Sequence, residues 1–121
     1  PANEFVFRFI GESSCLSAMV DERGINFSGE PMQIPCLKDL PHGAVRLFFR
    51  PSWLCLGAPA EQCDNRIPAR LKFSEFLGDI HRYHLDVGGS VLVADRRSPL
   101  ESRSGDPVTL GWNSNEMVVF H

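Results

Sequence analysis

Lysine is scarce in this chain, and so are long apolar runs. The two lysines, Lys38 and Lys72, each follow a leucine, so neither forms the Gly-Lys-Ser/Thr end of a phosphate-binding P-loop. No apolar run approaches the ~20 residues that a membrane-spanning helix needs, and no charged n-region precedes a short apolar stretch at the N-terminus. The sequence therefore argues against ATP hydrolysis through a P-loop and against direct insertion into a membrane.

Cysteines are few and widely spaced. The four, at positions 15, 36, 55 and 63, form no Cys-x-x-Cys pair and lie among apolar residues. This pattern is typical of small buried side chains and not of structural zinc, whose ligands come in short paired spacings. We expect no metal site, and the pattern favours a reducing compartment. An oxidised sample would still allow a disulfide between Cys55 and Cys63.

Basic charge is not in excess. Twelve basic and fifteen acidic residues give a net charge of −3, so the overall field does not attract nucleic acid or an anionic membrane. A nucleic-acid-binding barrel would need aromatic platforms beside a basic groove. Tyr83 and a face with Phe48 and Arg46 are too few residues to form such a surface. We expect one domain of 121 residues with a core of its own and no nucleic-acid partner.

The N-terminal segment has a helical period. Its apolar residues recur at helical spacing, at Ala2, Phe5, Val6, Phe9 and Ile10, and Gly11 is a plausible stop. This spacing predicts a short amphipathic helix over residues 2–11. Because so short a helix is marginal alone, it needs a surface for its stripe of Phe5 and Phe9.

The stretch from Ile67 to Asp95 predicts a bent strand, a turn and a tight hairpin. Apolar and polar residues alternate from Ile67 to Phe73, as in a strand with one buried face. Ser74 and Glu75 break this alternation, so we expect a β-bulge there that turns Phe76 inward. The chain then reverses at residues 77–79, alternates again over 81–87, and turns at Gly88-Gly89 into a returning strand over 91–94.

Other segments read as short strands separated by turn residues. The candidates are residues 15–20, 25–28, 32–36, 44–50, 108–112 and 117–120, with loops over 37–43, 57–65 and 96–105. The total is about eight or nine strands at the regular spacing of a barrel or sandwich. We therefore predict an all-β fold, an OB-like small β-barrel preceded by a short helix.

Several short motifs, in order, resemble a known arrangement. They are the opening Pro1–Glu12 segment, Leu47-Phe48-Phe49-Arg50-Pro51, Glu75-Phe76-Leu77-Gly78-Asp79, Gly105-Asp106-Pro107-Val108-Thr109-Leu110-Gly111-Trp112 and Val118-Val119-Phe120. In this succession the chain resembles the linker and C-terminal TOBE domain of ATP-binding subunits of ABC-type importers. The resemblance implies a linker helix over residues 1–12, following a missing nucleotide-binding domain, and a TOBE barrel over residues 13–121.

The resemblance also implies a role. The barrel would be a regulatory and dimerisation domain of a subunit that powers import of a small solute of the polyamine, ferric iron, sulfate or sugar class. ATP and magnesium would belong to the missing domain, so this fragment is not expected to be an enzyme or to carry a cofactor. The implied partners are a second copy of the ATP-binding subunit, the membrane subunits and a small-solute regulator. The implied location is cytoplasmic, at the inner face of the plasma membrane.

Three arginines are candidates for holding an anionic ligand. Arg50, beside Pro51 at a strand end, suits either a bidentate anion contact or a structural salt bridge. Arg96 and Arg97 belong to a local basic loop that could attract an oxyanion, although loop charges are usually only solvated. The candidate interface residues are Phe5, Phe9, Arg50, Pro51, Leu77, Gly78 and Asp79.

Two other functions stay open from the sequence. One is a free-standing barrel that binds a small oxyanion, and the other is the nucleic-acid-binding barrel disfavoured above. No nucleophile, base and orienting group suggest themselves as a set, so no catalytic residues are assigned.

Overall fold

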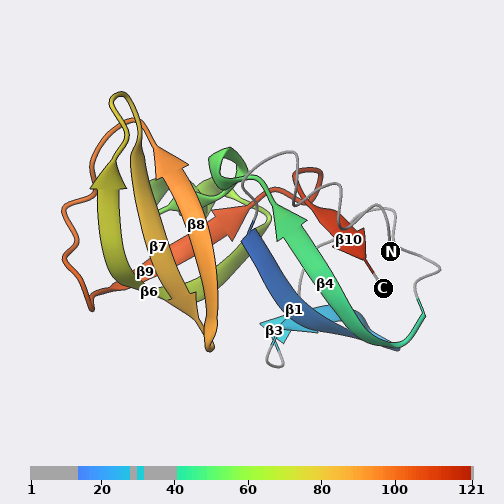
Figure 1. Ribbon diagram of the computed structural model, residues 1–121. Coiled ribbons are helices and arrows are strands. Elements are labelled where there is room, and N and C mark those ends of the chain that lie inside the picture. The colour runs from blue at the N-terminus through green and yellow to red at the C-terminus, as the bar shows by residue number, and fades with distance from the viewer. Residues whose placement is uncertain (1–13, 28–29, 32–40, 121) are drawn as a thin grey trace.

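Ten strands arranged in two five-stranded sheets make up the part of the chain that the computed structural model describes, which is residues 14–27, 30–31 and 41–120 (Figure 1). The first sheet has the order β10-β4-β1-β2-β3 and the second the order β5-β9-β6-β7-β8. The first contains β1 (Ser14–Asp21), β2 (Gly24–Phe27), β3 (Glu30–Pro31), β4 (Gly43–Phe49) and β10 (Val118–Phe120). The second contains β5 (Cys55–Leu56), β6 (Asn65–Phe76), β7 (His81–Val87), β8 (Ser90–Arg96) and β9 (Pro107–Trp112). Two 3₁₀ helices, η1 (Pro51–Trp53) and η2 (Ala58–Gln62), flank β5.

One core lies between the inward faces of the two sheets. Alternate residues of the strands are buried, as the period of two requires, so Val108, Leu110 and Trp112 of β9 all face inward. Tyr83, Leu85 and Val87 do the same on β7. Phe49 from the first sheet and Trp112 from the second meet edge to face, with ring centroids 4.8 Å apart. Aromatic contacts of this geometry bind the two sheets together.

The two sheets also meet along β1 and β8. The backbone N–H of Val93 donates to Ser14 Oγ at 2.6 Å, and the Ser14 hydroxyl donates back to the Val93 carbonyl at 3.1 Å. Ser14 is buried, so its side chain takes the place of a strand-to-strand hydrogen bond where the barrel closes.

The all-β prediction is confirmed, and most predicted strands are present. The predicted helix over residues 2–11 and the predicted strand over 32–36 lie outside the described residues. The loop predicted over residues 57–65 was wrong, because η2 lies within it, and β5, just before it, was not predicted. None of the helices in the described part of the chain has the length and apolar character needed to cross a bilayer.

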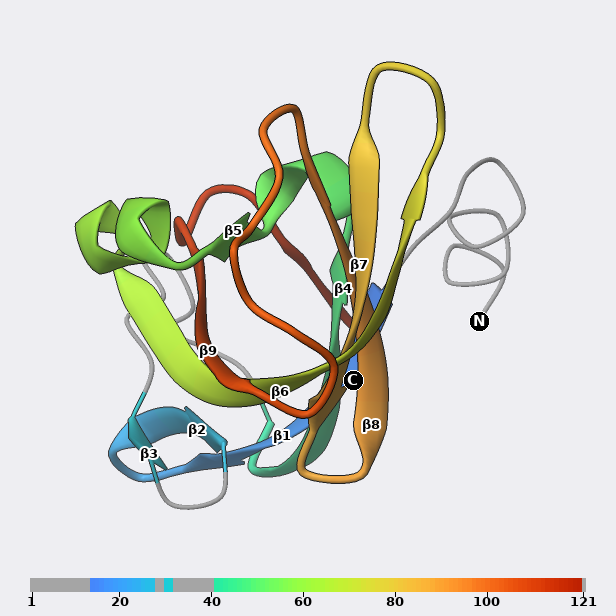
Figure 2. The same cartoon turned by 90° about the vertical axis from the view of Figure 1, so that its left-hand side faces the viewer.

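The bulge in β6 is present but lies earlier than the sequence suggested. Leu71 pairs with Leu85 of β7, and Phe73 pairs with the next residue along, His84, so Lys72 is the extra residue. Phe76 does not turn into the core; its side chain is 62% exposed. The physical reason is that β6 curves away from β9 to follow β7 (Figure 2), and its last residues extend beyond the barrel.

Candidate functional site

The predicted site residues gather at one end of the molecule. β8 ends at Arg96, whose strand partner is His81, the first residue of β7. The turn at Leu77-Gly78-Asp79 lies just before His81, and η1, which follows Arg50, packs against β8. The structure therefore brings the arginine segments and the β6–β7 turn to the same end of the second sheet (Figure 1). Phe5 and Phe9 lie outside the described residues.

Arg50 has an aromatic neighbour. It is exposed, and its guanidinium carbon lies 5.8 Å from the centroid of the Trp53 ring in η1. Pro51 between them is buried and starts the 3₁₀ turn that brings Trp53 back beneath Arg50. Because the ring quadrupole attracts a cation placed over an aromatic face, the Trp53 ring helps to hold the Arg50 side chain in this position.

Arg96 is hydrogen-bonded to neighbouring segments, whereas Arg97 is exposed to solvent. The Arg96 guanidinium donates to the Leu56 carbonyl at 3.4 Å and to Ser98 Oγ at 3.2 Å. Arg97 is exposed on the loop that leaves β8. Of the two, Arg97 is better placed to meet a ligand arriving from solvent, and Arg96 is better placed to position β5 against β8.

The β6–β7 hairpin exposes three large apolar side chains. Phe73, Phe76 and Leu77 are 50%, 62% and 47% exposed. The Phe76 ring lies 4.8 Å from that of His81, and the Phe73 ring stacks on His84 at 4.1 Å. Because Phe73 and Phe76 lie three positions apart on β6, opposite His84 and His81, they face opposite sides of the hairpin. Exposed apolar side chains on a protruding element are a candidate interaction surface.

Polar side chains line the outward face of the same hairpin. His84 Nε2 lies 2.9 Å from Glu75 Oε1. Arg82 holds Asp95 with two hydrogen bonds of 2.8 Å, and the two side chains are only 15% and 11% exposed. The hydrogen bonds to Asp95 raise the pKa of Arg82 above its ordinary value. A bidentate pair with little solvent around it fixes β7 to β8 on the outward face of the hairpin.

The sequence analysis did not predict these polar contacts on the outward face, although one of them could have been predicted. A two-residue turn at Gly88-Gly89 sets the register of β7 and β8, which places Arg82 opposite Asp95. The pair was therefore predictable from the turn. The contacts of Glu75 and Phe73 with His84 were not, because they depend on where the bulge lies.

One further contact shapes this end of the barrel. The Tyr83 hydroxyl accepts a 2.7 Å hydrogen bond from the backbone N–H of Leu100, which ties the loop after β8 to the core.

Burial, and then the neighbouring Cys55 thiol, raises the pKa of Cys63 to about 11. Both cysteines are free thiols. Among the described residues no group of three or more His, Cys, Asp or Glu side chains is placed to hold a metal ion.

Comparison with known families matches residues 45–120 to the TOBE domain. The chain belongs to the TOBE domain family. Two relatives align with nearly all of this TOBE chain. The sulfate/thiosulfate import ATP-binding protein CysA 1 of Rhizobium meliloti is 31% identical over 99% of it, and the spermidine/putrescine import ATP-binding protein PotA of Rubrobacter xylanophilus is 28% identical over 98%. This chain spans 34% of the length of each of these relatives.

A solved structure confirms the fold. The cytoplasmic molybdate-binding protein ModG, in a form with molybdate bound, matches the TOBE chain with a TM-score of 0.58. The match covers 67% of this chain and 64% of the other, at 14% identity. The OB-like barrel predicted from the sequence is therefore the fold of this chain, and the relatives of the TOBE domain are ATP-binding subunits of ABC importers.

Proposed function

We propose that this TOBE domain is the regulatory and dimerisation domain of the ATP-binding subunit of an ABC importer for a small solute. In this role the domain hydrolyses no ATP itself. ATP and magnesium act in the nucleotide-binding domain of the same subunit, and the barrel joins two subunits at the cytoplasmic face of the membrane. The membrane subunits are reached through the nucleotide-binding domain.

The observation that carries this proposal is the alignment with importer subunits. Two relatives named as import ATP-binding proteins align with 99% and 98% of the chain. The chain contains no P-loop lysine of its own. A domain of this kind therefore contributes to transport by binding, through differential affinity for two states of the assembly.

We also propose that the arginine end of the barrel receives a regulatory solute. Arg97 supports this role because it is exposed next to an arginine whose position is fixed by Leu56 and Ser98. Arg50 supports it as an exposed residue at the same end of the molecule, with its guanidinium positioned by Trp53. Guanidinium groups suit an oxyanion, and one named relative imports sulfate and thiosulfate. The second named relative imports spermidine and putrescine, which are cations, so the test includes both classes.

The test is a thermal melt of the 121-residue chain with sulfate, thiosulfate, spermidine or putrescine, alongside its solution mass from light scattering. We expect a reversible dimer and a melting temperature raised by sulfate or thiosulfate and not by the polyamines, because a ligand that binds only the folded state stabilises it and arginine side chains attract oxyanions. Arg97→Gln should abolish the shift. Arg103→Gln, which changes an exposed arginine of the same loop, should retain it. A strict monomer that responds to no solute would contradict the proposed function.

A further inference from the structure

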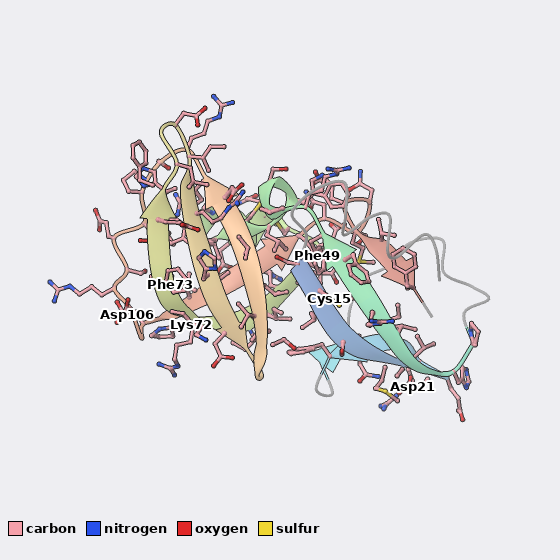
Figure 3. All side chains as sticks on the ribbon, viewed as in Figure 1. Cys15, Asp21, Phe49, Lys72, Phe73 and Asp106 are labelled. Atoms are coloured by element: carbon pink, nitrogen blue, oxygen red, sulfur yellow. The ribbon has the colours of Figure 1, made fainter. Side chains whose placement is uncertain are left out.

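Among the described residues, the last part of β6 has a strand partner on one side only. β6 pairs with β9 through Arg70, and Leu71 still exchanges hydrogen bonds with the backbone of residues 105 and 106. Beyond Leu71, the strand pairs only with β7 among the described residues. Figure 3 shows Lys72 and Phe73 on this part of β6. We call residues 72–76 the β6 edge.

The direction of the backbone groups on the β6 edge follows from the turn. The N–H of Leu77 donates to the Ile80 carbonyl at 2.8 Å. Hydrogen-bonded and non-hydrogen-bonded pairs alternate along an antiparallel ladder, so Glu75 bonds with its partner Arg82, and Phe73 with its partner His84. The N–H and C=O groups of Ser74 and Phe76 therefore point away from β7, toward the unpaired side.

The β6 edge is protected only in part. Natural proteins protect exposed edges with short strands, prolines, charges, bulges or covering loops, and of these the β6 edge has the bulge at Lys72 and the charges of Lys72 and Glu75. Here all five side chains are exposed, with Phe73 and Phe76 among the most exposed apolar residues of the described chain. The edge carries one positive charge, on Lys72, and one negative charge, on Glu75. A second copy of the same edge would therefore meet no net repulsion.

We propose that two copies of this chain pair their β6 edges antiparallel about a two-fold axis at Ser74. The inference rests on the proposed function, which requires two subunits to join, and it names the surface. Centring the ladder on Ser74 pairs Ser74 with its own copy, Phe73 with Glu75 and Lys72 with Phe76 of the other chain. This places no like charges directly opposite each other.

Other centres are less suitable. Centring the ladder on Glu75 places the two Glu75 side chains directly opposite each other, which is destabilising. Centring it on Phe73 places the outward-pointing backbone of Phe76 opposite Arg70, which already pairs with Pro107 of β9. If the two-fold axis passed between two residues, each residue whose N–H and C=O groups point outward would face one whose groups point toward β7. Such pairs cannot exchange hydrogen bonds, so no ladder forms.

The direct test replaces the outward N–H at position 74. Ser74→Pro removes a donor that points away from β7, so the hairpin keeps its own ladder, and proline is tolerated at such an edge position. We expect the wild-type chain to give a light-scattering mass of twice 13.5 kDa and Ser74→Pro to weaken the dimer at least tenfold. Ser74→Ala keeps the N–H and should dimerise as the wild type does.

A second control separates this edge from other apolar surface. Met19 on β1 is also 50% exposed, and Met19→Lys should leave the dimer intact. Circular dichroism and a melting curve establish that each variant is folded. Amide exchange should slow at Ser74 and Phe76 on dimerisation of the wild type.

The outcomes distinguish the two proposals. A wild-type dimer that Ser74→Pro leaves unchanged, or that only Met19→Lys breaks, would overturn edge pairing while leaving the proposed function standing. A monomeric wild type that still responds to a transported solute would overturn edge pairing and the joining of two subunits by the barrel, and would leave the regulatory role standing.

Discussion

Single side chains show how burial determines chemistry in this domain, and Cys63 is the clearest example. Its pKa is raised to about 11 by burial first and by the Cys55 thiol second. Because the folded state holds the proton more tightly than the unfolded chain, this thiol stabilises the fold below pH ~9 and loses that contribution as the pH rises toward 11. We expect the free energy of unfolding to fall over that window by on the order of 1 kcal/mol from this group, as measured by urea titration at each pH.

The variant Cys63→Ala isolates this effect. It should flatten the fall in unfolding free energy between pH 9 and 11 relative to the wild type, whereas Cys15→Ala, on β1, should leave the fall unchanged. Cys63 should also be alkylated slowly at pH 8, since the thiolate is the reactive form. Rapid alkylation of Cys63 in the folded protein, or an unchanged pH profile in Cys63→Ala, would contradict this account.

At the scale of elements, the packing of η2 on β9 depends on one glycine. A Cβ added to Gly111 would lie 2.9 Å from the Ala60 carbonyl oxygen and 3.0 Å from the Ala60 Cβ. Ala60 is fully buried, so η2 would have to shift outward. We expect Gly111→Ala to lower the free energy of unfolding by about 1–3 kcal/mol in a denaturant titration.

A local measurement separates this cause from a general loss of stability. The amides of Ala60 and Cys63 donate to the carbonyls of Gly57 and Ala60 within this turn, so their exchange should quicken in Gly111→Ala more than exchange on β7. Equal acceleration across the domain, or no change in stability, would show that η2 does not limit this position.

Elements also show where sequence was sufficient. The alternation of Val108, Leu110 and Trp112 predicts a half-buried strand, and these three side chains are buried. The bulge was misplaced at Ser74 and Glu75 because its position depends on the register with β7, and the structure puts it at Lys72. The bulge expected at Ser74 and Glu75 was also the reason for placing Phe76 inward, whereas its side chain is 62% exposed. The pattern of apolar and polar side chains does not show at which residue a strand extends beyond the hydrophobic core.

The sequence indicated which segments to consider for the candidate site, but it did not indicate the contacts that their side chains make. Arg96, Arg97 and the Leu77-Gly78-Asp79 turn were singled out from the sequence, and they lie at one end of the second sheet. The hydrogen bond from Arg96 to the Leu56 carbonyl joins residues 40 positions apart. Long-range contacts of this kind depend on how β5 and β8 meet, which no local pattern encodes.

At the scale of the whole molecule, closure of the barrel depends on Ser14. Its hydroxyl both accepts from the Val93 N–H and donates to the Val93 carbonyl, and so links the first sheet to the second. Ser14→Ala leaves both backbone groups without this partner, at a cost of about 1–3 kcal/mol in the free energy of unfolding. We expect that loss in a denaturant titration, with Val93 amide exchange quickening more than that of Leu85 on the buried face of β7.

Two matched variants decide whether closure is the cause. Ser14→Thr retains the hydroxyl and should keep most of the stability, whereas Ser17→Ala, on an exposed position of the same strand, should change it by less than about 0.5 kcal/mol. If Ser14→Ala lowers stability while Val93 stays protected, the side chain matters only for local packing of β1. If Val93 loses its protection while the rest of β8 keeps it, Ser14 holds the two sheets together at this seam. Unchanged stability in Ser14→Ala would instead mean that the shared core alone closes the barrel.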